Sequence, residues 1–353
     1  MQPYVFRVED FGRDWESLVT DTLSGYALSI LQDHVDPDLL FLGMEFGLFL
    51  STDGGVEWVK FTAGVPTVSV MDMAIQEREN DLVLGTHGRS IYILDDYSAL
   101  RGLDRDDFNQ RLAILSAGSG QQYDANQTPS TRFTGSGEFR AENEPYGVMV
   151  TFIASGDDLP HPDSEKERLR RDRRQGAAPA AENGKDGDEK PPRIEMTVRD
   201  ATGNVIRIRR QAVHQGINRI VWSMAADGVR PMPGPEPADL EDGLPAGIEV
   251  VPGVYEITLA LATGEQGPVT ARAPVTVLAD PRSPFSREDL ERNRQALNEL
   301  QDMREQAVAA VERIVHARAD VATAVSLVEQ QRLPGEEEDE NLAALVEQAA
   351  EIQ

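Results

Sequence analysis

Three side chains in the first hundred residues have the types and places that could support binding chemistry. Glu45 lies in the run LFLGMEFGLFLS, while His87 and Arg89 lie in the similar run LVLGTHGRSIYIL. A carboxylate, an imidazole and a guanidinium can hold a polar ligand through hydrogen bonds and charge. We therefore treat Glu45, His87 and Arg89 as a candidate ligand face. The alternative is structural: Glu45 and Arg89 would bond neighbouring segments, and His87 would bond within its own turn.

The sequence carries no complete catalytic set. Glu45 is a lone carboxylate, whereas glycoside hydrolysis uses a pair of carboxylates. The GSG triplets at 118–120 and 135–137 are not followed by a phosphate-loop lysine, and no G-x-S-x-G elbow occurs. We therefore predict no catalytic residue and no cofactor site within this chain, and enzymatic activity is the less favoured interpretation.

Metal ligands are equally sparse. The chain has no cysteine and no H-E-x-x-H motif, and its acidic runs at 186–189 and 336–340 do not match an EF-hand loop. The five histidines are scattered along the chain: His34, His87, His161, His214 and His316. The sequence therefore predicts no metal site.

Composition excludes several classes of protein. The chain has 353 residues and a formal net charge of −27, which argues against nucleic acid as a partner because that role needs a basic face. No apolar run approaches the roughly 18–20 residues of a membrane span. The opening run MQPYVFRVEDFG lacks the basic and apolar regions of a signal peptide, so no export signal is visible. At roughly 100–200 residues per domain, the length predicts two or three domains.

A repeat with a period of 43 residues organises the first hundred positions. The segment VEDFGRDW at 8–15 aligns with STDGGVEW at 51–58, and Asp96 follows Asp53 at the same offset. The second copy fits the pattern Ser/Thr-x-Asp-x-Gly-x-x-Trp, known as the Asp box. We predict structural roles in tight turns for Asp10, Gly12 and Trp15 in the first copy and for Ser51, Asp53, Gly55 and Trp58 in the second.

This period and the short β-rich runs are typical of β-propeller blades. Residues 1–100 would supply about two blades, whereas propellers close with four or more. We therefore expect that the propeller ring closes only with upstream blades or by self-association, because an open ring would leave unpaired strand edges.

The stretch at 40–100 resembles the last blades of large bacterial sortilin-like, Asp-box propeller proteins, often labelled glycosyl hydrolases or exo-sialidase-like. Its most specific part is GVPTVSVMDMAIQERENDLVLGTHGRSIYILDD, where Ser90 stands at a place the family usually gives to Gly. The resemblance implies a propeller, then a β-sandwich, then a helical tail, in a periplasmic or extracellular parent. It also implies that the turns carrying Glu45 and His87 lie on the ligand side, opposite the Asp boxes.

The middle of the chain predicts a β-sandwich. Residues 101–140 form a connecting segment, and residues 141–282 carry short strand patterns separated by turn signals, as in immunoglobulin or fibronectin type III domains. The charged run 156–193 interrupts this pattern and reads as a disordered insertion. Trp222 is expected in the core between the sheets.

The tail at 283–353 is predicted to be helical. Ser286 and Asp289 form a candidate capping box, and apolar residues recur along 285–333 with no Gly or Pro. Pro334 and Gly335 end this helix, and a second amphipathic stretch at 342–352 completes a helical hairpin or, alternatively, an oligomerising coiled coil.

The predicted protein is thus mainly β with a helical tail: partial propeller blades, an Ig-like sandwich and a helical hairpin. We expect a non-catalytic scaffold that binds a protein or glycan ligand. The alternative is a fragment of a secreted, sialidase-like glycoside hydrolase whose catalytic blades are missing. A third interpretation is an oligomer driven by the tail.

Overall fold

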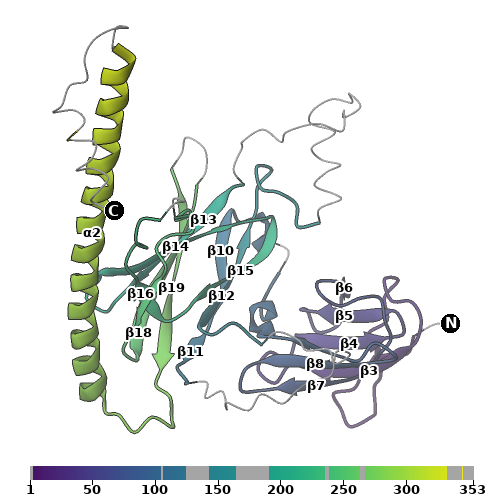
Figure 1. Ribbon diagram of the computed structural model, residues 1–353. Helices are drawn as coiled ribbons and strands as arrows, with labels where there is room; N and C mark the ends of the chain where they lie inside the picture. Colours follow the sequence, from purple (N-terminus) through teal and green to yellow (C-terminus); the bar gives the residue numbers. More distant parts are fainter. Residues whose placement is uncertain are drawn as a thin grey trace.

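The computed structural model describes residues 3–104, 106–124, 143–163, 191–234, 238–262 and 267–331, together with position 344. Within these residues the protein is mainly β, with six small sheets and one long C-terminal helix (Figure 1). The fold expected from the sequence is confirmed at this level. The second amphipathic stretch, 342–352, lies outside the described residues apart from position 344.

Three antiparallel sheets follow one another in the first hundred residues, each in simple chain order. They are β1 (Phe6–Arg7) and β2 (Glu16–Ser17); β3 (Ala27–Gln32), β4 (Leu40–Met44), β5 (Gly47–Ser51) and β6 (Val59–Phe61); and β7 (Val70–Gln76), β8 (Asp81–Thr86) and β9 (Ile91–Leu94). The strands β3 and β7 begin at residues 27 and 70, which is the 43-residue offset seen in the sequence.

The central sheet, β3–β6, is covered on both faces along β4 and β5, whose residues are apolar and buried at successive positions. Leu40, Leu42 and Phe49 pack toward the β1–β2 hairpin, together with Val5 and Leu18. Phe41 and Leu48 point the other way, in a cluster with Leu82 and Leu84 of the third sheet. A strand buried on both sides loses the usual alternation of apolar and polar residues, which explains the run LFLGM.

Gly43 allows the second and third sheets to approach closely. A Cβ at this position would lie 2.4 Å from Oγ of Ser29 and 2.7 Å from the carbonyl oxygen of Val70, the first residue of β7. No side chain fits in that space, so glycine is required where β7 crosses β4.

Two further sheets lie face to face and share one core. One contains β10 (Leu112–Ala117), β12 (Val148–Ala154) and β15 (Gly216–Trp222); the other has the order β11 (Ser119–Gln121), β19 (Val269–Leu278), β18 (Gly253–Leu261), β13 (Arg193–Arg199) and β14 (Val205–Ala212). Trp222 is buried between them beside Tyr255, as expected from the sequence. The strands β11 and β19 pair in parallel, whereas the other strand pairs are antiparallel.

The start of the predicted insertion 156–193 belongs to the packed structure. Leu159 is buried in the shared core, and the N–H of Gln215 donates to the carbonyl of Pro160. The strand β13 begins at Arg193. Residues 164–190 of this run lie outside the described residues.

The helix α2 (Arg287–Gln331) is about 67 Å long at 1.5 Å per residue and stands beside the two-sheet unit (Figure 1). The capping box is confirmed: Oγ of Ser286 accepts from the N–H of Asp289 at 3.2 Å, and the Asp289 carboxylate accepts from the N–H of Ser286 at 3.0 Å. Gln301 donates to the carbonyl of Asp227 in the hairpin of β16 (Ala225–Asp227) and β17 (Ala246–Glu249). Among the helix side chains that the structure describes, Val308 is the buried apolar residue.

Candidate functional site

Glu45 lies in the turn that joins β4 to β5. Its main-chain N–H donates to the carbonyl of Tyr26 at 3.0 Å, which fixes the turn against the start of β3. Its half-buried side chain reaches back toward Gly25, where a Cβ would lie 3.0 Å from Oε2. Within the described residues the Glu45 carboxylate has no hydrogen-bond or ion-pair partner.

His87 and Arg89 lie in the equivalent turn between β8 and β9. The N–H of His87 donates to the carbonyl of Ser69 at 2.9 Å, and Thr86 bonds the carbonyl of Ser90 through both its N–H and its hydroxyl. Both Gly88 and Ser90 have positive φ angles, of 78° and 67°. The left-handed conformation of Ser90 explains why glycine would suit this position. The side chains of His87 and Arg89 are exposed and have no partner in the part of the chain that the structure describes.

The two turns lie at the same edge of neighbouring sheets. Gly43, two residues before Glu45, touches Val70, and Val70 pairs with Thr86, the residue before His87. Each turn also bonds an equivalent carbonyl, since Tyr26 and Ser69 are 43 positions apart. No hydrogen bond or ion pair joins the three candidate side chains to one another within the described residues.

The two Asp turns lie at the other end of the strands, because a meander places successive turns at opposite ends. The Asp53 carboxylate accepts from the N–H of Glu57 at 3.0 Å and from Oγ of Ser51 at 2.7 Å. The Asp10 carboxylate accepts from the N–H of Asp14 at 3.0 Å in the same pattern. The backbone hydrogen bond from Asp14 lowers the pKa of Asp10. For Asp53, burial alone would raise the pKa, but the hydrogen bonds from Glu57 and Ser51 outweigh it and lower the pKa.

The two tryptophans of the repeat have different surroundings. Trp58 is 3% exposed, and its indole N–H donates to the carbonyl of Leu18 at 2.8 Å. Trp15 is 66% exposed and donates to the carbonyl of Gly12 in its own turn at 3.2 Å. The glycines Gly12 and Gly55 both have positive φ, of 93° and 95°. The shared turn geometry therefore does not by itself bury the tryptophan, and an adjoining sheet is needed as well.

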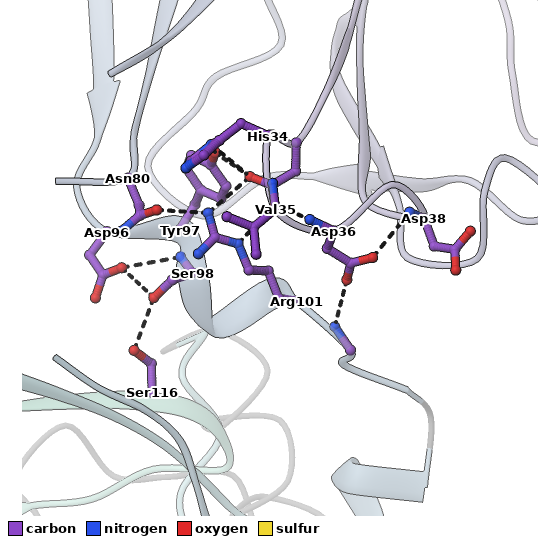
Figure 2. A network of polar contacts seen from close by, with 12 residues as sticks. His34, Val35, Asp36, Asp38, Asn80, Asp96, Tyr97, Ser98, Arg101 and Ser116 are labelled. Carbon is purple, nitrogen blue, oxygen red and sulfur yellow. Dashed lines mark hydrogen bonds and ion pairs between the residues drawn. The ribbon is translucent and has the colours of Figure 1, made fainter. Parts of the chain in front are cut away.

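A polar network that the sequence analysis missed centres on Asp33, in the turn after β3. Figure 2 shows the other members of this network, Tyr97, Arg101 and Asn80. The buried Asp33 carboxylate accepts from Nε of Arg101 at 2.8 Å, from its terminal nitrogen at 3.0 Å, and from the hydroxyl of Tyr97 at 2.5 Å. Arg101 also donates to Oδ1 of Asn80 at 2.7 Å. Tyr97 belongs to the short 3-10 helix η1 (Tyr97–Leu100) that follows the third sheet. The network therefore ties the end of the third sheet to the second.

Burial and bonding shift the pKa values of this network. Burial alone would raise the pKa of Asp33, but hydrogen bonds from Arg101 and Tyr97 outweigh it and hold the pKa well below its usual range. The pKa of Tyr97 is raised well above its usual range by burial and by its bond to the Asp33 carboxylate. Asp33 is therefore ionised and Tyr97 neutral at neutral pH, which suits a structural ion pair better than proton transfer.

Three acidic residues, Asp81, Asp95 and Glu144, lie close together where the first three sheets meet the two-sheet unit, which is the pair of facing sheets that contain β12 and β13. Burial, followed by the charge of Asp81, raises the pKa of Asp95. Burial, followed by the charges of Asp95 and Asp81, raises the pKa of Glu144. The guanidinium of Arg219, from β15, donates to the carbonyls of Asp95 and Asp96 at 2.7 Å each. Arg219 thus holds the two parts of the protein together at this group.

The described ranges carry neither a candidate metal cluster nor a helix suited to a membrane span. These residues contain no group of three or more His, Cys, Asp or Glu side chains that could hold a metal ion. No helix among them combines the length and the apolar character that a membrane span needs.

No protein-family model and no curated protein matches this sequence. Solved structures similar to the chain include the extracellular domain of BT4673 from B. thetaiotaomicron, described as part of a one component system, with 11% identity and a TM-score of 0.21 over 78% of this chain and 28% of that one. A second structure of the BT4673 domain, described as part of a hybrid two component system, gives 11% identity and a TM-score of 0.23 over 78% of this chain and 29% of that one.

The extracellular domain of BT3049, from the same organism and described as part of a hybrid two component system, gives 10% identity and a TM-score of 0.23 over 77% of this chain and 29% of that one. The chain therefore spans less than a third of the length of these structures.

Proposed function

We propose that this chain is a non-catalytic scaffold that binds a protein or glycan ligand through Glu45, His87 and Arg89. The observation that carries the proposal is the pair of equivalent turns, which meet at one edge and, within the described residues, leave these side chains without hydrogen-bond or ion-pair partners. A structural role would consume the carboxylate and the guanidinium in bonds to neighbouring segments.

The chemistry of the three side chains favours a polyhydroxylated ligand that also carries a carboxylate. Arg89 offers a planar fork of donors that matches a carboxylate, and Glu45 accepts bonds from hydroxyl groups. His87 can donate or accept depending on its protonation. An acidic glycan presents both kinds of group.

We further propose that the first three sheets are propeller blades, that β10–β19 form an Ig-like sandwich, and that α2 begins a helical hairpin. The 43-residue offset, the chain-order meanders and the Asp turns support the first assignment. The shared core around Trp222 supports the second. The proposed divisions are 1–100; the connection 101–140, whose strands β10 and β11 add edge strands to the two sheets of the sandwich; 141–282; and 283–353. The parent would act in the periplasm or outside the cell.

Binding of 3′-sialyllactose, with lactose as the neutral comparison, tests the proposal by isothermal titration calorimetry. We expect Arg89→Ala and Glu45→Gln each to weaken binding by at least tenfold, on the order of 1.4 kcal/mol. The matched control is Arg13→Ala, which removes another exposed arginine, from an Asp turn at the other end of the strands.

Two outcomes contradict the proposal. If Arg13→Ala weakens binding as much as Arg89→Ala, the attraction is non-specific charge and not this edge. If the protein releases sialic acid from the trisaccharide, the chain is an enzyme and the non-catalytic assignment is wrong.

A further inference from the structure

The third sheet repeats the first three strands of the second sheet with the same strand register. In the second sheet Phe41 pairs with Leu50 and Gly43 pairs with Leu48. In the third sheet Val83 pairs with Ile93 and Gly85 pairs with Ile91. The runs LFLGM and LVLGT therefore occupy the same places in two equivalent sheets.

The equivalent positions are covered in the second sheet and bare in the third. Leu48 is fully buried beneath the third sheet, whereas its counterpart Ile91 is 65% exposed. Leu50 packs against the same cluster, whereas its counterpart Ile93 is 58% exposed. We name the surface formed by Val83, Ile91 and Ile93 the aliphatic face. The equivalent surface of the second sheet is covered by another sheet.

The first sheet has an exposed surface on the side that faces away from the second sheet. Phe6 and Trp15 occupy the places of Phe49 and Trp58, which pack back onto the preceding hairpin. Here Phe6 and Trp15 stack edge to face at 6.0 Å and are 47% and 66% exposed. We name this pair the aromatic face. Within the described residues, the indole N–H of Trp15 donates to the carbonyl of Gly12 in its own turn and to no other group.

We propose that the aromatic face of one copy of this chain docks on the aliphatic face of a second copy. The contact would repeat the interface between the first and second sheets, where Phe49 and Trp58 pack against the apolar side of the β1–β2 hairpin. Such a contact joins two different surfaces, so it is head-to-tail and can propagate from copy to copy. This proposal does not depend on Glu45, His87 or Arg89, and ligand binding can fail without affecting it.

Two features of the aliphatic face define how the contact should respond to mutation. Gly85 corresponds to Gly43, over which β7 crosses, yet a Cβ at Gly85 would meet nothing closer than the carbonyl of Asp72 at 3.5 Å. Asp72 corresponds to Ser29 and shares the aliphatic face, because it pairs with Gly85. A buried carboxylate opposes docking, so Asp72→Ser should strengthen self-association, while Gly85→Ala should weaken it.

Sedimentation velocity across a concentration series tests the proposal. The wild type should associate reversibly, and more strongly at high salt, because a net charge of −27 opposes contact between copies. Trp15→Asp blocks the aromatic face and Ile93→Asp blocks the aliphatic face, and each variant alone should be monomeric. Mixing the two variants should give dimers and nothing larger, since one intact contact remains between them.

The matched control is Val254→Asp, which charges an equally exposed apolar strand residue of the two-sheet unit and should associate like the wild type. Because Trp15 and Ile93 are exposed, both blocking variants should keep the wild-type circular dichroism spectrum and melting temperature. If either fails to fold, Asp72→Ser and Gly85→Ala still test the contact in opposite directions.

Three results would overturn the proposal. The first is a wild type that stays monomeric at every concentration and salt level. The second is self-association that neither Trp15→Asp nor Ile93→Asp changes, which would point to α2 as the contact. A mixture of the two blocked variants that stays monomeric while the wild type associates excludes a head-to-tail contact.

Discussion

Arg101 forms a bidentate ion pair with Asp33, which lies 68 residues earlier in the chain. The Asp33 side chain is fully buried in its turn. The guanidinium also lies 5.5 Å from the centre of the Tyr97 ring, whose hydroxyl bonds the same carboxylate. One arginine therefore satisfies a buried charge and fastens the end of the third sheet to the second.

Removal of one partner of this pair should destabilise the protein strongly. Arg101→Met leaves the Asp33 carboxylate buried without its cation, which typically costs about 3–5 kcal/mol. Urea unfolding measures the change. The comparison variant is Arg78→Met, which breaks the exposed pair with Glu79 and should change the free energy of unfolding by less than about 1 kcal/mol. Equal effects would show that the network around Asp33 has no special role.

The same carboxyl should make stability depend on pH in the acid range. Its folded pKa is depressed, so its contribution is present above the unfolded pKa of about 3.9 and is lost as the pH falls toward the folded value. The wild type should therefore lose its stability advantage over Asp33→Asn at up to about 1.4 kcal/mol per pH unit below about pH 4. Unfolding curves of both proteins between pH 7 and pH 2 measure this difference. A constant difference over that range contradicts the assignment.

The pair Gly43 and Gly85 should respond differently to the same substitution. Gly43→Ala places a methyl group against the Val70 carbonyl, and the overlap should cost about 1–3 kcal/mol because backbone must move. Gly85→Ala makes only ordinary van der Waals contact with Asp72, at 3.5 Å, and should leave the stability of the monomer within about 0.5 kcal/mol. Thermal melts at low protein concentration separate the two. A large loss for Gly85→Ala would mean that its surroundings are already filled.

Trp58 and Trp15 make a second matched pair. Trp58→Phe removes the indole bond to Leu18 and leaves part of a buried site empty, so we expect a loss of about 1–3 kcal/mol. Trp15→Phe alters an exposed side chain and should stay within about 0.5 kcal/mol in the monomer. Urea unfolding of the two variants measures both values, and the opposite order would contradict the surroundings described for the tryptophans.

Local patterns in the sequence predicted the β-rich first half, the long helix and its capping box. The helix expected over 285–333 is observed at 287–331, because its start depends on neighbouring residues, Ser286 and Asp289. The core position of Trp222 follows from a strand pattern within a few residues of it. These features are decided by contacts that are close in the chain.

Contacts between distant segments were not predictable from the same patterns. The run DHVDPD indicates a turn, but no residue near it in the sequence indicates that Asp33 pairs with Arg101. The triplet at 118–120 looks like a loop because it is rich in glycine, yet Gly120 lies in a strand where a Cβ would press on Met224 and Val148. The exposure of Trp15 was likewise hidden, because its turn has the same sequence signals as the turn that buries Trp58.

The parallel pairing of β11 with β19 has a consequence for synthesis of the chain. Ser119 pairs with Thr276, so β11 leaves the ribosome 157 residues before its partner does. At about 5–20 residues per second, β11 remains without that partner for roughly 8–30 seconds. During this interval the inner surface of the β10–β12 pair is open to chaperones and to neighbouring nascent chains. The two-sheet unit therefore closes after translation has passed residue 278, and a ribosome stalled earlier should display this surface to a protease.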